Sequence, residues 1–452
     1  MYFRTILPEL EYWKTSTNRK PLILRGARQV GKTTVVNLFS KQYTQYIYLN
    51  LERVEDADLF LKHTHFATLV EAIFFNKNKN IQEQDTLLFI DEIQAVPEAI
   101  NLLRYFFEDY PWLHVIAAGS LLETIMREEV SVPVGRVEYK VLRPVSFREF
   151  LTAMGEDAAL KQYDNIPIQD FAHAKLLQLF HRYVLIGGMP EIVQQYVERQ
   201  NLTALLPIYE SLQVSFISDV EKYARNNNLV NVIRHVISAM PFEAGNRIKF
   251  QNFGQSSYGS REVGEAMRII EKAMLLHLVY PSTSFALPAL PDKRKSPRLH
   301  LLDTGLTNYV AGLQKDLLGI QELNSLYQGK IAEQVIGQEL LAAKFNVLNE
   351  LHFWIREKKD STAEVDFIYT FEGKLIPLEV KSGDTGRLRS LHLFMDGSPH
   401  QMAVRLYGGQ LRKETIRTPT GKAFSLLNLP YYLAGKLEHY LKWAFSGAAQ
   451  NH

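Results

Sequence analysis

Residues 22–39 read LILRGARQVGKTTVVNLF, which is a short apolar run, a polar loop and the start of a helical pattern. From Gly26 to Thr33 the loop matches the spacing GxxxxGK[ST]. Glycines at these positions let backbone N–H groups approach phosphate oxygens, and the helix that follows favours negative charge at its N-terminus. The stretch therefore predicts a nucleoside triphosphate cradle between a strand and a helix of an α/β sheet.

The polar side chains of this cradle have predictable roles. Lys32 is expected to neutralise the β and γ phosphates, and the Thr33 hydroxyl is expected to reach Mg²⁺. The competing interpretation, a glycine-rich turn that binds nothing, does not account for the strand and the helix on either side. We predict ATP and Mg²⁺ as ligands, with nucleotide contacts from Gly26, Ala27, Arg28, Gln29, Val30, Gly31, Lys32, Thr33 and Thr34.

A second motif, TLLFIDEIQ, ends a buried strand in two acids. Asp91 can hold Mg²⁺ at the carboxyl end of this strand, and Glu92 can polarise the attacking water, which indicates hydrolysis rather than nucleotide storage. Taken alone, the pair could also be two solvated carboxylates. The next buried run ends in Ser120, which can sense the γ-phosphate or cap a helix.

The segment GRVEYKVLRPVSFREF offers two candidates for an arginine finger, Arg136 and Arg143. The alternative is that both are ordinary surface or ion-pair residues. A finger that acts on a neighbour's nucleotide requires a homo-oligomer.

The chain is expected to divide into four parts. Strand and helix patterns alternate over residues 1–150, which predicts a parallel sheet covered by helices on both faces. Residues 151–225 keep only helical spacing and predict a helical lid. Two helices, a Gly/Ser-rich turn and a hairpin over 226–318 predict a winged helix. Residues 319–452 begin with a helix and continue in short β-patterned runs, which predicts an α/β domain.

Residues 363–383, AEVDFIYTFEGKLIPLEVKSG, have the composition of a metal-dependent nuclease site. Asp366 and Glu379 can bind Mg²⁺, which lowers the pKa of a bound water, and Lys381 can position that water. Glu333, on the preceding helix, can complete the metal shell. Glu379 and Lys381 project to one face of a strand, and a hairpin would bring Asp366 to them. The alternative is a solvent-facing hairpin with cross-strand ion pairs, but both charges interrupt an apolar run, where unpaired charge is expensive.

A short basic run, PDKRKSPRLH, lies where the wing of a winged helix would be. Its cations can neutralise phosphates, so DNA is a predicted partner, although such a run is often only a solvated loop. The cations are Lys293, Arg294, Lys295 and Arg298.

Composition limits these interpretations. The 452 residues are too many for one compact core, and 46% hydrophobic with 22% charged residues is ordinary for a folded protein. The 51 basic and 49 acidic residues leave a net charge of +2, so contacts with polyanions must come from local patches. The chain has no cysteine, which excludes disulfides and thiolate chemistry. No apolar run approaches the roughly 20 residues of a membrane helix, and we expect a cytoplasmic protein.

The motifs together resemble one family of bacterial and archaeal AAA+ ATPases. They are LRGARQVGKTT, LLFIDEIQ, AAGSLLE, GRVEYKVLRPVSFREF, LIGGMPEIV, LDTGL and AEVDFI…IPLEVKSG. Members of that family end in a domain of unknown function similar to PD-(D/E)XK endonucleases, and they are related to signal-transducing (STAND-type) NTPases. The resemblance implies a P-loop sheet with an additional strand and a catalytic glutamate, a helical lid, a winged helix and a restriction-endonuclease-like α/β domain. It matches the cradle, Asp91, Glu92 and Ser120 to the ATPase pattern, and the four residues of the C-terminal site to the nuclease pattern. No sensor-II arginine is identified in the lid.

These features favour an ATP-hydrolysing module whose nucleotide state controls a C-terminal Mg²⁺-dependent endonuclease-like domain that acts on DNA. The alternative is a regulatory switch whose nuclease-like domain only binds DNA or a protein partner. Intact Asp366, Glu379 and Lys381 favour the enzyme, because a domain that has lost catalysis has no chemical need for all three. A helicase is a third class, and no helicase motif set supports it.

Overall fold

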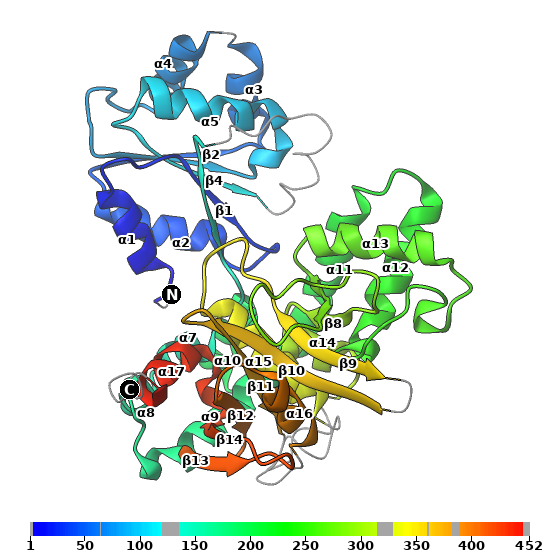
Figure 1. Ribbon diagram of the computed structural model, residues 1–452. Coiled ribbons are helices and arrows are strands. Elements are labelled where there is room, and N and C mark those ends of the chain that lie inside the picture. Colours follow the sequence, from blue (N-terminus) through cyan, green and yellow to red (C-terminus); the bar gives the residue numbers. More distant parts are fainter. Residues whose placement is uncertain are drawn as a thin grey trace.

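The computed structural model describes residues 3–63, 65–119, 135–313, 329–358, 361–381 and 388–445. Figure 1 shows an N-terminal sheet with helices, a largely helical part beside it, and a second sheet in the C-terminal part. Ser120, the predicted γ-phosphate sensor, lies outside the described residues. None of the helices in the described ranges is long and apolar enough to cross a membrane.

The N-terminal sheet has five parallel strands in the order β2-β3-β4-β1-β5. Strand β4 lies between β1, which leads into the cradle, and β3, which ends at Asp91. It is the predicted additional strand, and the sheet order is typical of the P-loop AAA fold, so the predicted α/β class is confirmed. The strands are β1 (Leu22–Arg25), β2 (Gln45–Asn50), β3 (Thr86–Asp91), β4 (His114–Gly119) and β5 (Glu138–Val141).

Alternate side chains of these strands enter two different cores, as the two-residue period of a strand requires. Leu22 and Leu24 of β1 belong to the core that contains side chains of helices α1 and α2, whereas Ile23 packs with side chains of α3, α4 and α5. Figure 1 shows the two groups of helices on opposite sides of the sheet. The helices are α1 (Leu7–Thr15), α2 (Lys32–Phe39), α3 (Val54–Lys62), α4 (Phe66–Asn76) and α5 (Pro97–Asp109).

The middle of the chain is mainly helical, which agrees with its helical spacing. It contains α7 (Phe147–Ala153), α8 (Asp157–Asp164), α9 (His173–Ile186), α10 (Pro190–Arg199), α11 (Leu206–Glu221), α12 (Asn227–Ala239), α13 (Ser260–Lys272) and α14 (Thr304–Val310). Strands β6 (Leu276–Val279) and β8 (Arg298–Leu301) pair in antiparallel fashion after α13. Two helices followed by a hairpin are the order that a winged helix requires, and that assignment stays a prediction.

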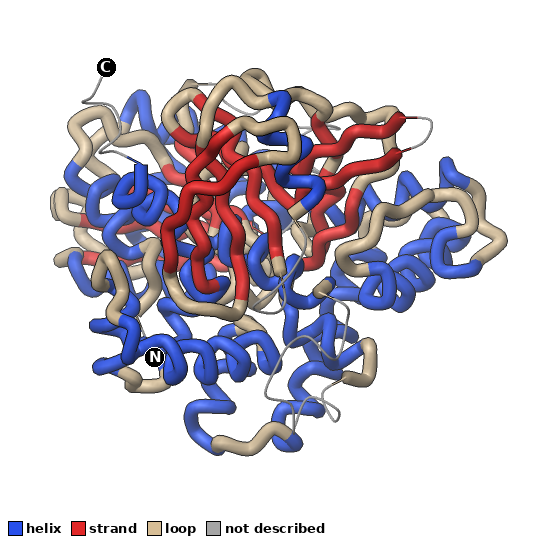
Figure 2. Tube along the Cα trace, turned by 60° about the horizontal axis from the view of Figure 1, so that its bottom comes forward, coloured by secondary structure: helices blue, strands red, loops and turns tan. Residues whose placement is uncertain are grey.

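A mixed sheet of seven strands forms the C-terminal part, in the order β13-β14-β12-β11-β10-β9-β7. Its strands are β7 (Pro281–Ser282), β9 (His352–Lys358), β10 (Ser361–Phe371), β11 (Lys374–Val380), β12 (Met402–Tyr407), β13 (Arg412–Arg417) and β14 (Ala423–Pro430). In Figure 2 these strands gather near the centre, and helices surround them. The helices of this part are α15 (Lys330–Ala342), α16 (Arg389–Gly397) and α17 (Leu437–Phe445). Because β7 comes from the region assigned to the winged helix and pairs with β9, the two parts share a sheet.

One hydrophobic core runs through all these parts. It includes Val36 of α2, Phe180 of α9, Val335 of α15 and Leu406 of β12. Phe147, at the start of α7, is fully buried within it, and its ring centroid lies 5.0 Å from that of Phe180. The nucleotide-binding sheet and the C-terminal sheet are therefore joined by packing and not only by the chain.

We predict that Phe147→Ala lowers the free energy of unfolding by about 3–5 kcal/mol, because it removes a fully buried ring and leaves a cavity. Urea denaturation followed by circular dichroism measures the change. The control is Phe171→Ala, whose side chain is 76% exposed and whose loss should change stability by less than about 0.5 kcal/mol. Equal urea midpoints for the two variants would contradict the role of Phe147 in the shared core.

Candidate functional site

The cradle has the backbone conformation that phosphate binding needs. Gly31 has φ +94° at the N-terminal end of α2, a conformation that favours glycine. A Cβ on Gly26 would lie 2.4 Å from the carbonyl oxygen of Leu142, in the segment after β5. Glycine is required at Gly26 because the backbone of a neighbouring segment passes directly beside it.

Lys32 is folded back onto the loop that precedes it. Its Nζ donates hydrogen bonds to the carbonyl oxygens of Gly26 and Ala27, at 3.0 and 2.9 Å. Burial lowers the pKa of Lys32, while the nearby charges of Glu92 and Asp91 oppose that change. A buried cation held by two carbonyls is well placed to exchange them for phosphate oxygens.

Thr33 and Asp91 meet at the carboxyl end of β3, as the two motifs predict. The Thr33 hydroxyl donates to Asp91 Oδ2 at 2.6 Å, and burial raises the pKa of Asp91. These are oxygen ligands of the kind Mg²⁺ prefers, so the residues present fit that ion. Glu92 follows in a left-handed conformation with φ +51° and lines the same cavity as the cradle.

A cavity of about 590 Å³ lies over the cradle. Three residues that line it were not anticipated from the sequence. They are Arg4 from the N-terminal segment and Glu191 and Gln194 from α10. Arg28 extends from the cradle to Asp219 of α11, with 2.5 Å between Nη1 and Oδ1. The part predicted to be the lid thus contacts the cradle, and its described residues that line the cavity are Pro190, Glu191 and Gln194.

Neither arginine-finger candidate lines this cavity. Arg136 is exposed and pairs with Glu108, with 2.8 Å between Nε and Oε1. Arg143 is buried, and its Nη1 lies 3.1 Å from His277 Nε2. Burial of Arg143 disfavours contact with a neighbour's nucleotide, and a finger role for either arginine in a homo-oligomer stays a prediction.

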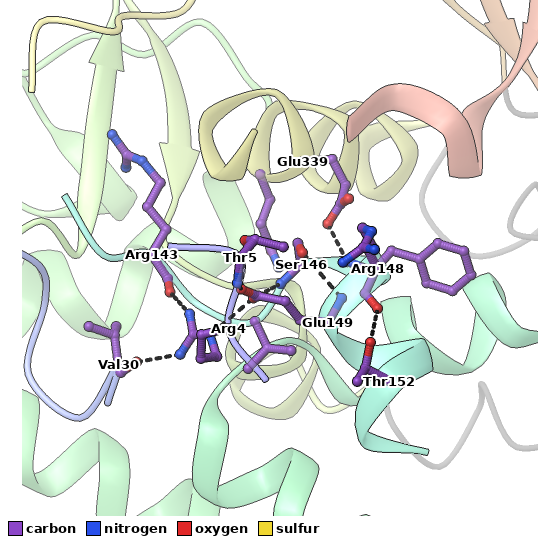
Figure 3. A network of polar contacts seen from close by, with 12 residues as sticks. Arg4, Thr5, Val30, Arg143, Ser146, Arg148, Glu149, Thr152 and Glu339 are labelled. Atoms are coloured by element: carbon purple, nitrogen blue, oxygen red, sulfur yellow. Dashed lines mark hydrogen bonds and ion pairs between the residues drawn. The ribbon is translucent and has the colours of Figure 1, made fainter. Parts of the chain in front are cut away.

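Arg4 links the cradle to the segment after β5 (Figure 3). Its guanidinium donates to the carbonyl oxygens of Val30 at 3.0 Å and Arg143 at 2.7 Å, and its Nε lies 3.1 Å from Glu149 Oε2. Arg4 and Glu149 are both buried. Glu149 also closes the capping box of α7 with Ser146. No sequence motif marks Arg4, because its partners are backbone carbonyls and a carboxylate far along the chain.

The same network reaches the C-terminal part through Glu339 of α15 (Figure 3). Glu339 Oε1 accepts hydrogen bonds from the Phe147 backbone N–H at 2.9 Å and from the Tyr183 hydroxyl at 2.8 Å. Burial raises the pKa of Glu339 to about 7. Two contacts therefore hold the N-terminal end of helix α7. Arg4 pairs with Glu149 in its first turn, and Glu339 of α15 accepts the hydrogen bond of its first N–H.

The C-terminal residues come together on a β10–β11 hairpin. Asp366 Oδ2 accepts a hydrogen bond from the Val380 N–H at 2.7 Å, and Lys381 Nζ lies 2.6 Å from Glu379 Oε1. The pairing of β10 with β9 shifts register between Val365 and Ile368, so Asp366 sits at a β-bulge. Bulges turn side chains away from the regular alternation of a strand. The hairpin that the sequence predicts is confirmed, and the bulge that places Asp366 was not anticipated.

Arg298 is the unexpected member of this cluster. Its Nη1 lies 3.1 Å from Glu333 Oε2, its Nη2 lies 3.8 Å from Asp366 Oδ1, and it also pairs with Glu364. Its side chain is 8% exposed. The signal in the sequence was weaker than for Glu379, because Arg298 only begins the run RLHLL, which forms a buried strand.

The basic run that contains Arg298 is engaged mostly within the protein. Burial of Arg298 removes it from the predicted DNA-binding cluster. Arg294 pairs with Asp292, and Lys295 Nζ lies 2.5 Å from Glu357 Oε2. Lys293 of the run is exposed, and contact of this run with DNA stays a prediction.

Among the described residues of the C-terminal cluster, carboxylates outnumber cations. Burial, and next the charge of Asp366, raises the pKa of Glu333 and that of Glu379 to about 8. Glu379 Oε2 is buried without a hydrogen-bond partner in the described structure. Within the described ranges, no three His, Cys, Asp or Glu side chains are grouped so as to hold a metal ion. The roles of Glu333, Asp366 and Glu379 as metal ligands stay predictions.

Three family models match successive parts of the chain. Residues 18–151 match an AAA domain, and residues 177–317 and 328–432 match two different domains of unknown function. An AAA domain is thus followed by two domains whose descriptions name no activity. The resemblance to endonucleases is not shown by these matches.

Known proteins similar to this chain are distant. An uncharacterized protein of Haemophilus influenzae is 22% identical over 383 residues, which are 79% of this chain and 81% of the relative. A solved Walker-type ATPase of Pyrococcus abyssi has a TM-score of 0.44 and 14% identity, over 69% of this chain and 96% of its own. RuvB of Thermotoga maritima has a TM-score of 0.27 and 15% identity, over 61% of this chain and 88% of its own.

We predict that Arg4→Met destabilises the protein by about 3–5 kcal/mol, because it leaves the Glu149 carboxylate buried without its counter-ion. Chemical denaturation measures the loss. The matched control is Arg136→Met, which removes an exposed ion pair and should cost at most about 1 kcal/mol.

The double variant Arg4→Met/Glu149→Gln separates charge from packing. It should be more stable than Arg4→Met alone, because no uncompensated carboxylate remains. If Glu149→Gln lowers the free energy of unfolding further when it is added to Arg4→Met, the Arg4–Glu149 contact does not depend on charge compensation. That result would contradict the role given to the ion pair.

Proposed function

We propose that the protein is an ATP-hydrolysing switch whose nucleotide state is transmitted to its C-terminal part. One observation carries the proposal: Lys32, Thr33 and Glu92 line the cavity over the cradle, and the Thr33 hydroxyl donates a hydrogen bond to Asp91. The match of residues 18–151 to an AAA domain supports it. A nucleotide store would need the cradle but would have no use for Glu92 beside it.

Each residue has a defined task in this proposal. Lys32 leaves the carbonyls of Gly26 and Ala27 and binds the β and γ phosphates, while the loop N–H groups hold the remaining phosphate oxygens. Thr33 and Asp91 would hold Mg²⁺, which supplies positive charge to the phosphates. Glu92 orients and polarises the attacking water.

The route from nucleotide to C-terminal part follows from the contacts of Arg4. Movement of Lys32 changes the conformation of the cradle loop. The Val30 carbonyl of that loop accepts a hydrogen bond from Arg4. Arg4 holds Glu149 in α7, and the first N–H of α7 is held by Glu339 of α15. A shift of the loop is therefore passed through rigid, buried contacts to the helix that carries Glu333.

We predict that the wild-type protein hydrolyses ATP and that Glu92→Gln lowers kcat by about 100-fold or more, because the amide cannot polarise water. The affinity for ATP should stay within about threefold of the wild type, whereas Lys32→Ala should weaken binding about tenfold or more. Phosphate release and binding of a fluorescent ATP analogue measure the two effects.

Glu71→Gln, an exposed glutamate on α4, is the matched control and should leave both quantities unchanged. Equal turnover in Glu92→Gln and Glu71→Gln would overturn the role of Glu92. Absence of ATP binding in the wild type would overturn the proposed function as a whole.

A second function, Mg²⁺-dependent cleavage of DNA by the C-terminal part, is favoured by the charge of its cluster. Among the described residues, the carboxylates of Glu333, Glu364, Asp366 and Glu379 pair with two cations, Arg298 and Lys381. A divalent cation would supply the missing charge, and the unpartnered Glu379 Oε2 is an open oxygen for it. The competing role, a domain that only binds DNA or a protein, is favoured by Arg298, which already compensates Glu333 and Asp366.

We predict that DNA cleavage in Mg²⁺ or Mn²⁺ is lost by at least about 100-fold in Glu379→Gln and retained in Glu372→Gln. Glu372 is exposed in the turn of the same hairpin and serves as the control. Labelled linear, single-stranded and branched DNA, with and without ATP, are the substrates. If no substrate is cut while ATP is hydrolysed, the C-terminal part is a binding domain, and the nuclease proposal falls without affecting the ATPase.

A further inference from the structure

Arg28 lines the nucleotide cavity without a task in the proposed function. The described lining of that cavity holds three cationic side chains, Arg4, Arg28 and Lys32. Arg4 pairs with the buried carboxylate of Glu149, and Lys32 is assigned to the β and γ phosphates. Neither arginine-finger candidate from the sequence lines this cavity, so Arg28 is the remaining arginine that can serve a bound nucleotide there.

Arg28 is placed among the charges that would handle the phosphates. It is the third residue of the cradle loop, which runs from Gly26 to Thr33. Burial lowers the pKa of Arg28, but the charges of Asp219 and then Glu92 raise it above its ordinary value. The charge of Arg28 in turn adds to burial in lowering the pKa of Lys32. The guanidinium is thus within electrostatic reach of both the phosphate-binding lysine and the glutamate that polarises water.

Arg28 pairs with Asp219 of α11, in the part predicted to be the lid. Its Nη1 lies 2.5 Å from Asp219 Oδ1, and its side chain is 30% exposed. The side chain of Asp219 is 9% exposed, and a second cation, Lys222, has its Nζ 3.7 Å from Oδ1. A partly exposed arginine can leave this carboxylate by rotating its side chain, because Lys222 continues to compensate the negative charge.

We propose that Arg28 is the arginine that contacts the γ-phosphate of ATP bound to the same chain, and that Asp219 holds this arginine until ATP binds. The inference rests on the proposed ATPase. A guanidinium suits the role because it gives paired hydrogen bonds to phosphate oxygens and compensates the charge that develops on them. ADP has no γ-phosphate and leaves Arg28 with Asp219. The contact between the cradle and α11 therefore breaks with ATP and forms again with ADP.

The hydrolytic step uses Arg28 only as a positive charge. The water oxygen forms a bond to the γ-phosphorus while the bond from that phosphorus to the β–γ bridging oxygen breaks. Glu92 takes a proton of the water and later releases it to solvent, and the products are ADP and inorganic phosphate. Arg28 neither gains nor loses a proton, because its guanidinium stays charged.

The competing interpretation is that the ion pair only fastens α11 to the cradle. Loss of either partner should then have the same effect, because both losses break the same contact. Under the proposal the two losses change ATP binding in opposite directions. Without Arg28 a phosphate ligand is missing, whereas without Asp219 the group that competes with phosphate for Arg28 is missing. The sign of the two effects decides between the interpretations.

The test compares Arg28→Gln with Asp219→Asn in the full-length protein. Arg28→Gln should lower kcat about 100-fold or more and weaken ATP binding about tenfold, with ADP affinity within about threefold of the wild type. Asp219→Asn should strengthen ATP binding about threefold or more. Phosphate release measures kcat. Displacement of a fluorescent nucleotide by ADP or by a non-hydrolysable ATP analogue measures the two affinities.

The matched control is Arg234→Gln, which removes another ion pair of α11. Arg234 Nε lies 2.5 Å from Glu221 Oε1, and Arg234 is not among the residues that line the cavity. This variant should keep the kcat and both affinities of the wild type. If Arg28→Gln fails to fold, Arg28→Lys replaces it. The lysine keeps the charge without the paired hydrogen bonds, and kcat should fall about tenfold.

A mixture of Arg28→Gln and Glu92→Gln proteins tests whether the arginine acts within its own chain. Turnover should stay at the level of the separate variants. Recovery of turnover in the mixture would show that the arginine serves a neighbour's nucleotide, and the assignment to the same chain would be wrong.

Three other outcomes contradict the inference in different ways. Equal kcat in Arg28→Gln and Arg234→Gln overturns the role of Arg28 and leaves the ATPase intact. ATP binding that is unchanged or weakened in Asp219→Asn overturns the role of Asp219, because the pair is then only a structural contact. If the wild type neither binds nor hydrolyses ATP, the proposed function fails, and this inference fails with it.

Discussion

The ion pair between Arg4 and Glu149 is the contact on which the arrangement of the parts depends. Both groups are buried, so each requires the other as a counter-ion. Arg4 also satisfies the carbonyls of Val30 in the cradle and Arg143 after β5. A single guanidinium thus fixes three segments relative to one another: the cradle loop, the segment after β5 and the first turn of α7.

The same constraint, compensation of buried charge, also operates in the C-terminal cluster. In the C-terminal cluster, Arg298 arrives from the hairpin before α14 and neutralises carboxylates on α15 and β10. Where the protein balances its own buried charge in this way, the result is a joint between parts.

These joints give the molecule a route between its sites. The continuous hydrophobic core prevents the nucleotide sheet and the C-terminal sheet from moving as independent bodies without loss of packing. The polar contacts of Arg4, Glu149 and Glu339 run through that core. Under the proposed function, these contacts would pass a change at the cradle to α7 and α15.

Local sequence determined the cradle, the Asp91–Glu92 pair, the parallel α/β sheet and the hairpin that joins Asp366 to Glu379, because each depends on spacing and periodicity within a few residues. Sequence did not reveal Arg4 or Asp219 at the nucleotide site, and it placed Arg298 on a DNA-binding wing. Only the tertiary structure determined the positions of these residues, because each pairs with a charge far away in the chain. The pairs are Arg4 with Glu149, Arg28 with Asp219, and Arg298 with Glu333. A charged residue in an apolar run shows that a partner must exist, but the fold alone decides which residue it is.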